Sequence, residues 1–142
     1  MKIAIGSDHA GFYLKEDLIK YLEEKNIEVK DMGPFDDNRV DYPDYGHAVG
    51  HEVIDNKMDF GIVICGSGIG ISISANKVKG IRAALCSDCF SAQATREHNN
   101  ANVLCLGARV IGPELAFRIA DTFLDSKFSN DERHIRRISM FD

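Results

Sequence analysis

A cysteine leads directly into a glycine-rich loop near the middle of this 142-residue chain. Cys65 ends an apolar run at residues 60–65, and Gly66-Ser67-Gly68-Ile69-Gly70 follows it. Backbone amides that open from such a loop, ahead of a helix, favour negative charge and the thiolate form of a nearby cysteine. Cys65 is therefore a candidate base or nucleophile. The alternative is a small buried apolar residue, the usual role of an isolated cysteine.

A pair of polar residues follows the first apolar run. Asp8 and His9 come directly after residues 3–6. In right-handed strand–helix–strand units the carboxyl ends of parallel strands share one edge of the sheet, so we expect this pair on the same edge as Cys65. The pair indicates a functional site. The alternative is that Asp8 only caps a helix that begins near Ala10.

Cations that could bind a phosphate group occur late in the chain. Arg109 follows the last apolar run, and Arg133 and Arg137 are four residues apart, which places them on one face of a short, basic terminal helix. Two guanidinium groups on one face can bind phosphate through forked donors, with His134 beside them. The alternative is a solvated basic tail.

His98 lies at the end of a helix predicted from Asp88 to His98. This helix runs from the carboxyl edge of the sheet back to its amino edge, which leaves His98 far from Cys65 of the same chain. Either His98 is structural or it serves the site of a neighbouring subunit. We favour the second, in a homodimer whose sites draw on both chains.

Five short apolar runs alternate with helix-like stretches, a pattern typical of strand–helix–strand units and a parallel sheet. They cover residues 3–6, 27–29, 60–65, 81–86 and 103–106. The sequence therefore predicts an α/β fold, a single Rossmann-like three-layer domain over residues 1–142 with a five-stranded parallel sheet.

Two helices and one long loop are predicted between these runs. In the first helix an apolar face alternates with charged positions, namely Leu14, Leu18, Tyr21 and Leu22 against Lys15, Glu16, Lys20 and Glu23. The second helix covers residues 114–123, with Leu115, Ile119 and Phe123 in register after Pro113. Residues 32–45 are rich in glycine, proline and aspartate and are predicted to form a loop, and long loops in compact domains are often functional.

The composition excludes several classes of protein. The net charge of −5 does not favour nucleic acid or an anionic membrane as a partner. No signal peptide precedes the first apolar run, and no apolar stretch approaches membrane-spanning length, so we expect a cytoplasmic protein. The four cysteines are then expected as reduced thiols rather than disulfides.

The C-x-x-C spacing and the glycine loop each allow a second interpretation. Cys86 and Cys89 have a C-x-x-C spacing, but a zinc site needs a second close pair, and a dithiol redox site is less favoured than simple packing. The glycine loop also resembles a dinucleotide-binding fingerprint, with Asp88 about twenty residues further on. Its third glycine comes one residue early, however, and the loop follows the third strand rather than the first.

With these residues assembled, the chain resembles ribose-5-phosphate isomerases of type B, in the family that also contains the galactose-6-phosphate isomerase subunits. The resemblance runs nearly end to end. It rests on the segments Gly6-Ser7-Asp8-His9-Ala10-Gly11, Val40-Asp41-Tyr42-Pro43, Ile64-Cys65-Gly66-Ser67-Gly68-Ile69-Gly70, Gly80-Ile81-Arg82-Ala83, His98-Asn99-Asn100-Ala101-Asn102 and Arg133-His134.

The resemblance implies an intramolecular oxidoreductase that interconverts ribose 5-phosphate and ribulose 5-phosphate, in the non-oxidative branch of the pentose phosphate pathway, without metal or organic cofactor. Cys65 would be the base, Ser67 would steady the thiol or the sugar, and His98 would help open the furanose ring. The amides of Gly66, Ser67, Gly68, Ile69 and Gly70 would hold the enediolate oxygen. Asp8, His9, Tyr42 and Asn99 match sugar-binding positions, and Arg109, Arg133, His134 and Arg137 match phosphate contacts.

Two points stay open at the level of sequence. In another branch of the family a glutamate after the glycine loop is the base; here that position is Ile71, so the task falls to Cys65. The substrate could instead be a six-carbon phosphate such as galactose 6-phosphate or allose 6-phosphate, or the chain could be a non-catalytic module that binds a sugar phosphate or nucleotide. A homodimer, or a tetramer built from two such dimers, is expected.

Overall fold

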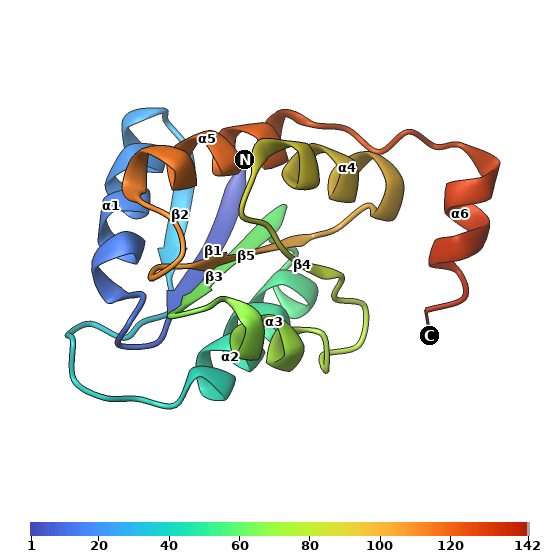
Figure 1. The fold of residues 1–142 in the computed structure, drawn as a ribbon. Coiled ribbons are helices and arrows are strands. Elements are labelled where there is room, and N and C mark those ends of the chain that lie inside the picture. The colour runs from blue at the N-terminus through green and yellow to red at the C-terminus, as the bar shows by residue number, and fades with distance from the viewer. Residues whose placement is uncertain (142) are drawn as a thin grey trace.

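The computed structural model describes residues 1–141, in which a parallel β-sheet is covered by helices on both faces (Figure 1). Every strand pair is parallel, and the order across the sheet is β2-β1-β3-β5-β4. The strands are β1 (Lys2–Ser7), β2 (Glu28–Asp31), β3 (Phe60–Cys65), β4 (Ala83–Leu85) and β5 (Val103–Gly107). The predicted α/β fold and its five parallel strands are confirmed.

The helices form two layers, one on each face of the sheet (Figure 1). The helices are α1 (Phe12–Glu24), α2 (Tyr42–Asp55), α3 (Ile69–Ala75), α4 (Cys89–Asn99), α5 (Pro113–Asp125) and α6 (Glu132–Ile138). One apolar core joins α1, α4 and α5 to the sheet, and the other joins α2 and α3. The last helix, α6, stands outside both layers and packs beside α4. No helix within residues 1–141 is long and apolar enough to cross a membrane.

The strand order creates a crevice between β1 and β3. From β1 the chain first moves outward to β2, and then crosses to β3 on the other side of β1. The connections after β1 and β3 therefore leave in opposite directions, and ligands of open parallel sheets bind at this reversal, outside the carboxyl ends of the strands. Asp8 and Cys65 both lie at this point of the sheet.

The structure differs from the sequence-based prediction at several points, of which these three are examples. The loop predicted over residues 32–45 ends earlier, because α2 already begins at Tyr42 with Pro43 in its first turn, where a missing N–H costs nothing. The first helix begins at Phe12 rather than near Ala10. In α5, Leu115 is 37% exposed, and Ala116 and Ala120 take the buried stripe with Ile119 and Phe123.

Lys15 is the clearest surprise in the fold. The helical pattern placed it among the charged positions of α1, yet its side chain is fully buried, with 0% exposure. It contacts two carboxylates instead of water.

The end of β5 lies directly beneath the glycine loop. A Cβ atom added at Gly107 would come within 2.5 Å of the carbonyl oxygen of Ser67, which belongs to the backbone and cannot rotate away. The same strand end is hydrogen bonded to the loop, since the Ala108 amide donates to the Cys65 carbonyl at 2.9 Å. Glycine at position 107 therefore allows the loop to sit on the sheet.

We predict that Gly107→Ala lowers the free energy of unfolding by about 1–3 kcal/mol, because the added methyl group forces the two backbones apart. Urea denaturation measures this. Gly112→Ala is the matched control, since a Cβ there meets no atom within 4 Å and its effect should stay below about 1 kcal/mol. Equal losses in the two variants would contradict the close-approach argument.

Candidate active site

A cavity of about 520 Å³ opens at the carboxyl edge of the sheet, at the reversal between β1 and β3. Its walls come from the ends of β1, β3 and β5 and from the start of α2. The lining residues are Asp8, Tyr42, Cys65, Gly66, Ser67, Ile69, Gly70, Arg109 and Val110. Eight of these nine residues were predicted from the sequence. Val110 was not, although its position next to Arg109, just past the last apolar run, could have indicated that it lies near the site.

Cys65 lies at the floor of this cavity. It is buried at the end of β3, and the amide of Gly68 donates a hydrogen bond to its Sγ atom at 3.1 Å. Gly68 adopts a positive φ of 78°, a conformation that favours glycine, directly before α3 begins. An N–H donor at sulfur is the contact that stabilises a thiolate. The loop thus places an N–H donor directly on the thiol of Cys65.

Ser67 occupies the exposed crest of the loop. Its Oγ atom accepts a hydrogen bond from the amide of Ile69 at 3.2 Å, which fixes the hydroxyl over the start of α3. The first amides of a helix have no acceptor within the helix itself. The loop therefore presents a hydroxyl group and partly positive backbone to the cavity.

Asp8 is held between β1 and β3. Its amide donates to the carbonyl of Ile64 at 3.0 Å, and its Oδ1 atom accepts from the amide of Gly11 at 3.0 Å. The carboxylate thus binds an amide of the turn just ahead of α1 and also lines the cavity, whereas α1 itself begins after Gly11 with no side-chain cap. His9, the next residue, is half-buried outside the lining, with Nδ1 3.2 Å from the carbonyl oxygen of Val40.

Arg109 supplies the positive charge among the lining residues. Its amide donates to the carbonyl of Gly66 at 2.9 Å, which ties the turn after β5 to the glycine loop. Its guanidinium lies over Gly66, where an added Cβ would be 3.2 Å from Nη1. This placement brings a forked cationic donor to the mouth of the cavity, where it could bind a phosphate oxygen.

Tyr42 closes the opposite wall. It is the first residue of α2, and its ring packs so closely on Gly70 that an added Cβ would come within 2.6 Å of the ring. The loop over residues 32–41 therefore delivers an aromatic hydroxyl to the cavity.

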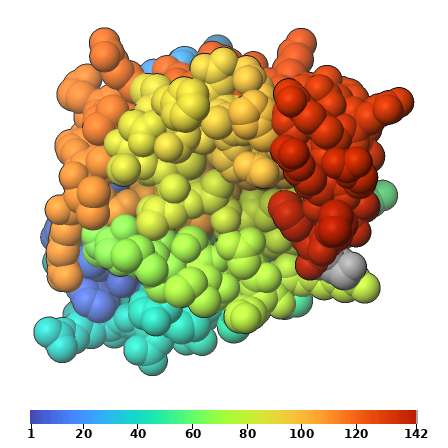
Figure 2. Space-filling view, turned by 45° about the vertical axis from the view of Figure 1, so that its right-hand side comes forward, coloured from blue at the N-terminus to red at the C-terminus, as the bar shows by residue number. Residues whose placement is uncertain are grey.

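The other predicted site residues lie elsewhere in the chain. His98 and Asn99 end α4, which starts at the carboxyl edge and runs about 14 Å back along the sheet, and Arg133 and Arg137 are exposed on α6. Figure 2 shows α6, in red, beside the yellow-to-orange surface of α4. None of these residues lines the Cys65 cavity. Within one chain the structure thus places the predicted residues in two separate groups.

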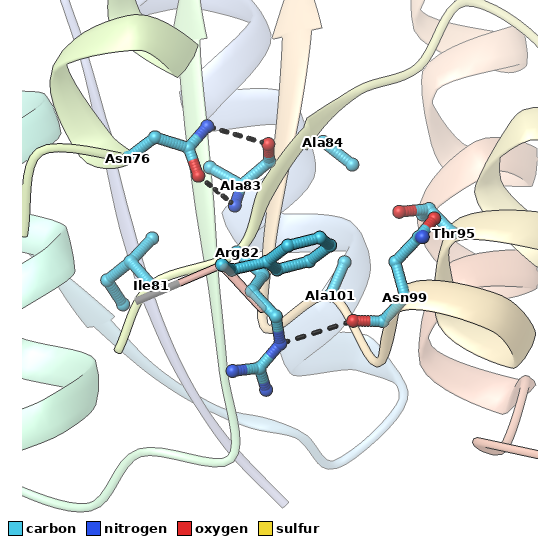
Figure 3. A pocket seen from close by; sticks show the side chains of 9 residues that line it. Asn76, Ile81, Arg82, Ala83, Ala84, Thr95, Asn99 and Ala101 are labelled. Atoms are coloured by element: carbon cyan, nitrogen blue, oxygen red, sulfur yellow. Dashed lines mark hydrogen bonds between the residues drawn. The ribbon is translucent and has the colours of Figure 1, made fainter. Parts of the chain in front are cut away.

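Asn99 lines a second cavity, of about 480 Å³, beside the edge strand β4 (Figure 3). Its backbone carbonyl accepts a hydrogen bond from Nε of Arg82 at 3.2 Å, and Asn76 bonds both backbone groups of Ala83 on the far wall. The side chains of Asn76 and Arg82 thus hold the backbone around β4 through hydrogen bonds.

The expected phosphate contact of His134 stays a prediction, and its contacts within the chain are these. Its side chain is buried, with Nδ1 2.7 Å from Oγ of Ser129 and its ring centroid 4.6 Å from that of His98. Burial lowers the pKa of His134, and the adjacent Arg133 acts in the same direction. In this chain the residue packs against His98 rather than facing solvent beside the arginines.

Cys86 and Cys105 are buried thiols outside the Cys65 cavity. Cys86 is buried, and burial together with Asp88 raises its pKa to about 11. Burial also raises the pKa of Cys105 well above the ordinary value. A redox dithiol needs a lowered pKa, so the packing interpretation of Cys86 is favoured over the redox one. Across residues 1–141, no three His, Cys, Asp or Glu side chains are grouped so that they could hold a metal ion.

Comparison with known proteins gives concordant matches. A family model described as Ribose/Galactose Isomerase matches residues 3–141. The ribose-5-phosphate isomerase B of Listeria innocua is 52% identical over 91% of this chain and 87% of its own length. The D-erythrulose-4-phosphate isomerase of Pectobacterium atrosepticum is 48% identical over 90% of this chain and 85% of its own length. The crystal structure of a ribose 5-phosphate isomerase from Thermotoga maritima superimposes with a TM-score of 0.97, at 53% identity, over 99% of this chain and 97% of that one.

The lowered pKa of His134 predicts an acid-dependent loss of stability. Above the ordinary pKa of histidine both folded and unfolded states hold a neutral ring; below it the unfolded state binds a proton that the folded state resists, so stability falls as pH falls. In His134→Gln the free energy of unfolding should therefore decrease less between pH 7 and pH 5 than in the parent protein. Urea titrations at each pH measure this.

His47→Gln is the control, because His47 is exposed on α2, which packs on the opposite face of the sheet from α4. Its pH dependence should follow the parent protein. A parent-like pH dependence in His134→Gln would contradict the assignment.

Proposed function

This chain belongs to the ribose/galactose isomerase family, and we propose that it interconverts ribose 5-phosphate and ribulose 5-phosphate through an enediolate. The observation that carries the proposal is the cavity that joins a buried, amide-bonded Cys65 to Asp8 and Arg109. Family membership makes the chain a sugar-phosphate isomerase, and the cavity supplies groups suited to each part of such a substrate. The whole of residues 1–142 is proposed to act as one isomerase domain.

Cys65 is proposed as the base. As a thiolate it removes the proton from C2 of the open-chain aldose, which leaves an enediolate. The proton of the O2 hydroxyl then moves to O1, and the thiol returns its own proton to C1 to give the ketose. The developing negative charge on the oxygen is stabilised by the amides of the glycine loop, at the start of α3. Ser67, whose hydroxyl is fixed by the Ile69 amide, lies where it can bond the sugar or the thiol.

The remaining cavity residues are proposed to bind the substrate. Asp8 and Tyr42 would bond the sugar hydroxyls from opposite walls, and Arg109 would bind the phosphate at the mouth. His9, which holds Val40, would contact the sugar beside Asp8. None of these steps requires a metal or an organic cofactor.

The second group of residues is proposed to complete the site of a partner subunit. Ring opening needs an acid–base group near neutral pH, which suits His98, and the phosphate needs more positive charge than Arg109 alone provides. Since α4 carries His98 away from its own Cys65, a second copy must supply it. Asn99, Arg133 and Arg137 would arrive with it, and His134 would support His98 through their ring contact.

An exposed apolar surface supports the homodimer. Ile69, Ile73, Leu85, Phe90 and Val110 are all at least 41% exposed. Ile69, Leu85 and Val110 line one hollow of about 220 Å³, and two of them, Ile69 and Val110, also line the Cys65 cavity. A second copy seated on this surface would therefore reach the mouth of the site. Contiguous apolar surface of this kind marks protein contacts, and dimers of identical chains are the commonest form.

A four-carbon substrate is the second candidate. A relative 48% identical to this chain is named D-erythrulose-4-phosphate isomerase, and the same enediolate chemistry applies to a shorter sugar. Six-carbon phosphates such as galactose 6-phosphate remain the third. The assay therefore compares ribose 5-phosphate, D-erythrulose 4-phosphate and galactose 6-phosphate. Highest kcat/KM on ribose 5-phosphate supports the first proposal, and turnover on none of them supports a non-catalytic binding module.

We predict that Cys65→Ala lowers kcat on the preferred substrate at least about 100-fold, because the proton carrier is removed. A coupled spectrophotometric assay measures the loss. Cys89→Ala is the matched control, since Cys89 is a half-buried cysteine outside the cavity, and it should change kcat less than about threefold. Comparable kcat values for Cys65→Ala and the control would reject Cys65 as the base.

We also predict complementation between two inactive variants. In a mixture of Cys65→Ala and His98→Asn chains, half of the dimers contain both, and each of these has one intact site, so about one quarter of the parent activity should return. Denaturing and refolding the variants together, against each refolded alone, measures the recovery. If activity does not return although mixed dimers form, the shared-site proposal is wrong.

A further inference from the structure

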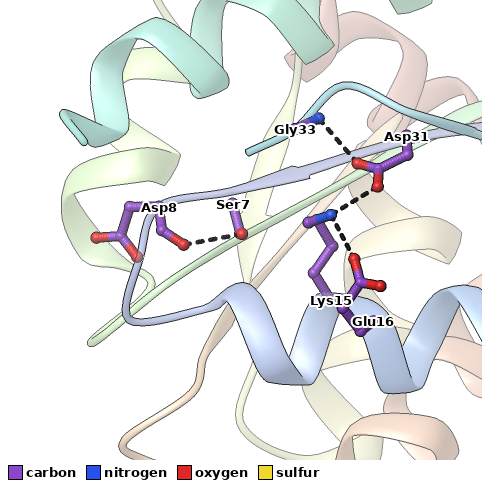
Figure 4. A network of polar contacts seen from close by, with 6 residues as sticks. All are labelled: Ser7, Asp8, Lys15, Glu16, Asp31 and Gly33. Atoms are coloured by element: carbon purple, nitrogen blue, oxygen red, sulfur yellow. Dashed lines mark hydrogen bonds and ion pairs between the residues drawn. The ribbon is translucent and has the colours of Figure 1, made fainter. Parts of the chain in front are cut away.

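Lys15 is the one lysine whose side chain is fully buried within residues 1–141, and it does not line the Cys65 cavity. Its Nζ atom lies 2.7 Å from Oδ2 of Asp31 and 2.9 Å from Oε1 of Glu16 (Figure 4). It also lies 5.3 Å from the ring centroid of Phe12. A buried ammonium is costly unless it is fully paired, and replacing buried ion pairs with apolar residues is often neutral or stabilising. Stability alone therefore does not account for Lys15.

Asp31 connects this ammonium to the turn after β2. While Oδ2 binds Lys15, Oδ1 accepts a hydrogen bond from the amide of Gly33 at 2.8 Å. The carbonyl of Gly33 in turn accepts from the amide of Ser7 at 3.0 Å, at the last residue of β1. Asp8 of the cavity is the next residue. Figure 4 shows the part of this hydrogen-bonded path that runs from Lys15 through Asp31 to Gly33, and the bond from Ser7 to Gly33 continues it to the edge of the site.

The same turn begins the loop that ends at Tyr42. Phe35, two residues past Gly33, lies with its ring centroid 5.9 Å from Nζ of Lys15. Further along, the hydroxyl of Tyr13 donates to Asp37 at 2.8 Å. Lys15 and Tyr13 are both on α1, so α1 holds the loop over residues 32–41 from its beginning to its middle. The loop then delivers Tyr42 to the wall of the cavity.

We propose that Lys15 is a positioning residue of the active site: through Asp31 it fixes the Gly33 turn, and so places Asp8 and Tyr42 in the cavity. Only the expected effect of Lys15 on enzyme kinetics rests on the proposed function; its effect on the position of the loop does not. Cys65 is held by β3 and by Gly68, outside this path, so removing Lys15 affects substrate binding rather than proton transfer.

The test uses Lys15→Met and Asp31→Asn in the full-length chain. Asp31→Asn keeps the volume of the side chain and leaves Lys15 paired with Glu16, and circular dichroism and urea denaturation establish that each variant is folded before its kinetics are compared. In both variants KM should rise about tenfold while kcat stays within about threefold, because interactions equal in ground and transition states are lost. A variant that is only less folded would lower kcat and leave KM unchanged.

A second readout does not depend on activity. Arg39 is an exposed tryptic site within the loop, so its rate of cleavage by trypsin in the folded protein reports how often the loop leaves α1. Cleavage after Arg39 should be at least about tenfold faster in both variants. If the enzyme proves inactive on every sugar phosphate, this measurement still decides the positioning claim.

Lys25→Met is the matched control. Lys25 follows the same helix and pairs with Asp121 of α5, but it does not touch the loop. Its KM and its cleavage rate at Arg39 should match the parent protein. Parent-like KM and parent-like cleavage in Asp31→Asn, or the same changes in Lys25→Met, would overturn the proposal.

Discussion

The hydrogen-bonded ladder between the carboxyl ends of β1, β3 and β5 is the constraint on which the rest of the structure depends. It continues past the strands, through the bonds from Asp8 to Ile64, from Ala108 to Cys65 and from Arg109 to Gly66. These bonds set a carboxylate, a thiol and a guanidinium at one level of the sheet. Three residues far apart in sequence thereby meet around one cavity, with no loop required to fold over them.

The same parallel architecture separates the second group of residues from the first. A helix that follows one parallel strand must return to the opposite edge before the next strand, so α4 carries His98 away from the cavity. Symmetry offers a simple solution, because a two-fold axis brings the far end of one chain to the near end of another. In the proposed homodimer, the exposed apolar residues next to the cavity would form part of such a contact.

Much of this was predictable from the sequence, for physical reasons. Continuous apolar runs identify β3 and β5 because both faces of these strands are covered, and every residue of β5 is buried. Glycine and proline indicated the loops. Because strand–helix–strand units are right-handed, the residues that follow the strands were expected to meet at the carboxyl edge of the sheet. The cavity residues that directly follow strands were therefore found, whereas Val110 carries no polar signal.

The rest depended on tertiary contacts that no local pattern reveals. Lys15 occupies a polar position of α1, but Asp31 and the aromatic rings around it make a buried place for its charge. Pro43 was interpreted as a loop residue although it begins α2, because proline suits both places. His134 was grouped with the arginines beside it in sequence, while the fold turns its ring to Ser129 and His98.

The most direct test of the central claim is a crystal structure of the protein with bound ribose 5-phosphate or a hydroxamate mimic of its enediolate. The account predicts the sugar in the Cys65 cavity, with Sγ within about 3.5 Å of C1 or C2 and His98 of a second chain over the ring oxygen. A sugar phosphate bound elsewhere, such as in the cavity beside β4, or a site completed within one chain, would contradict it.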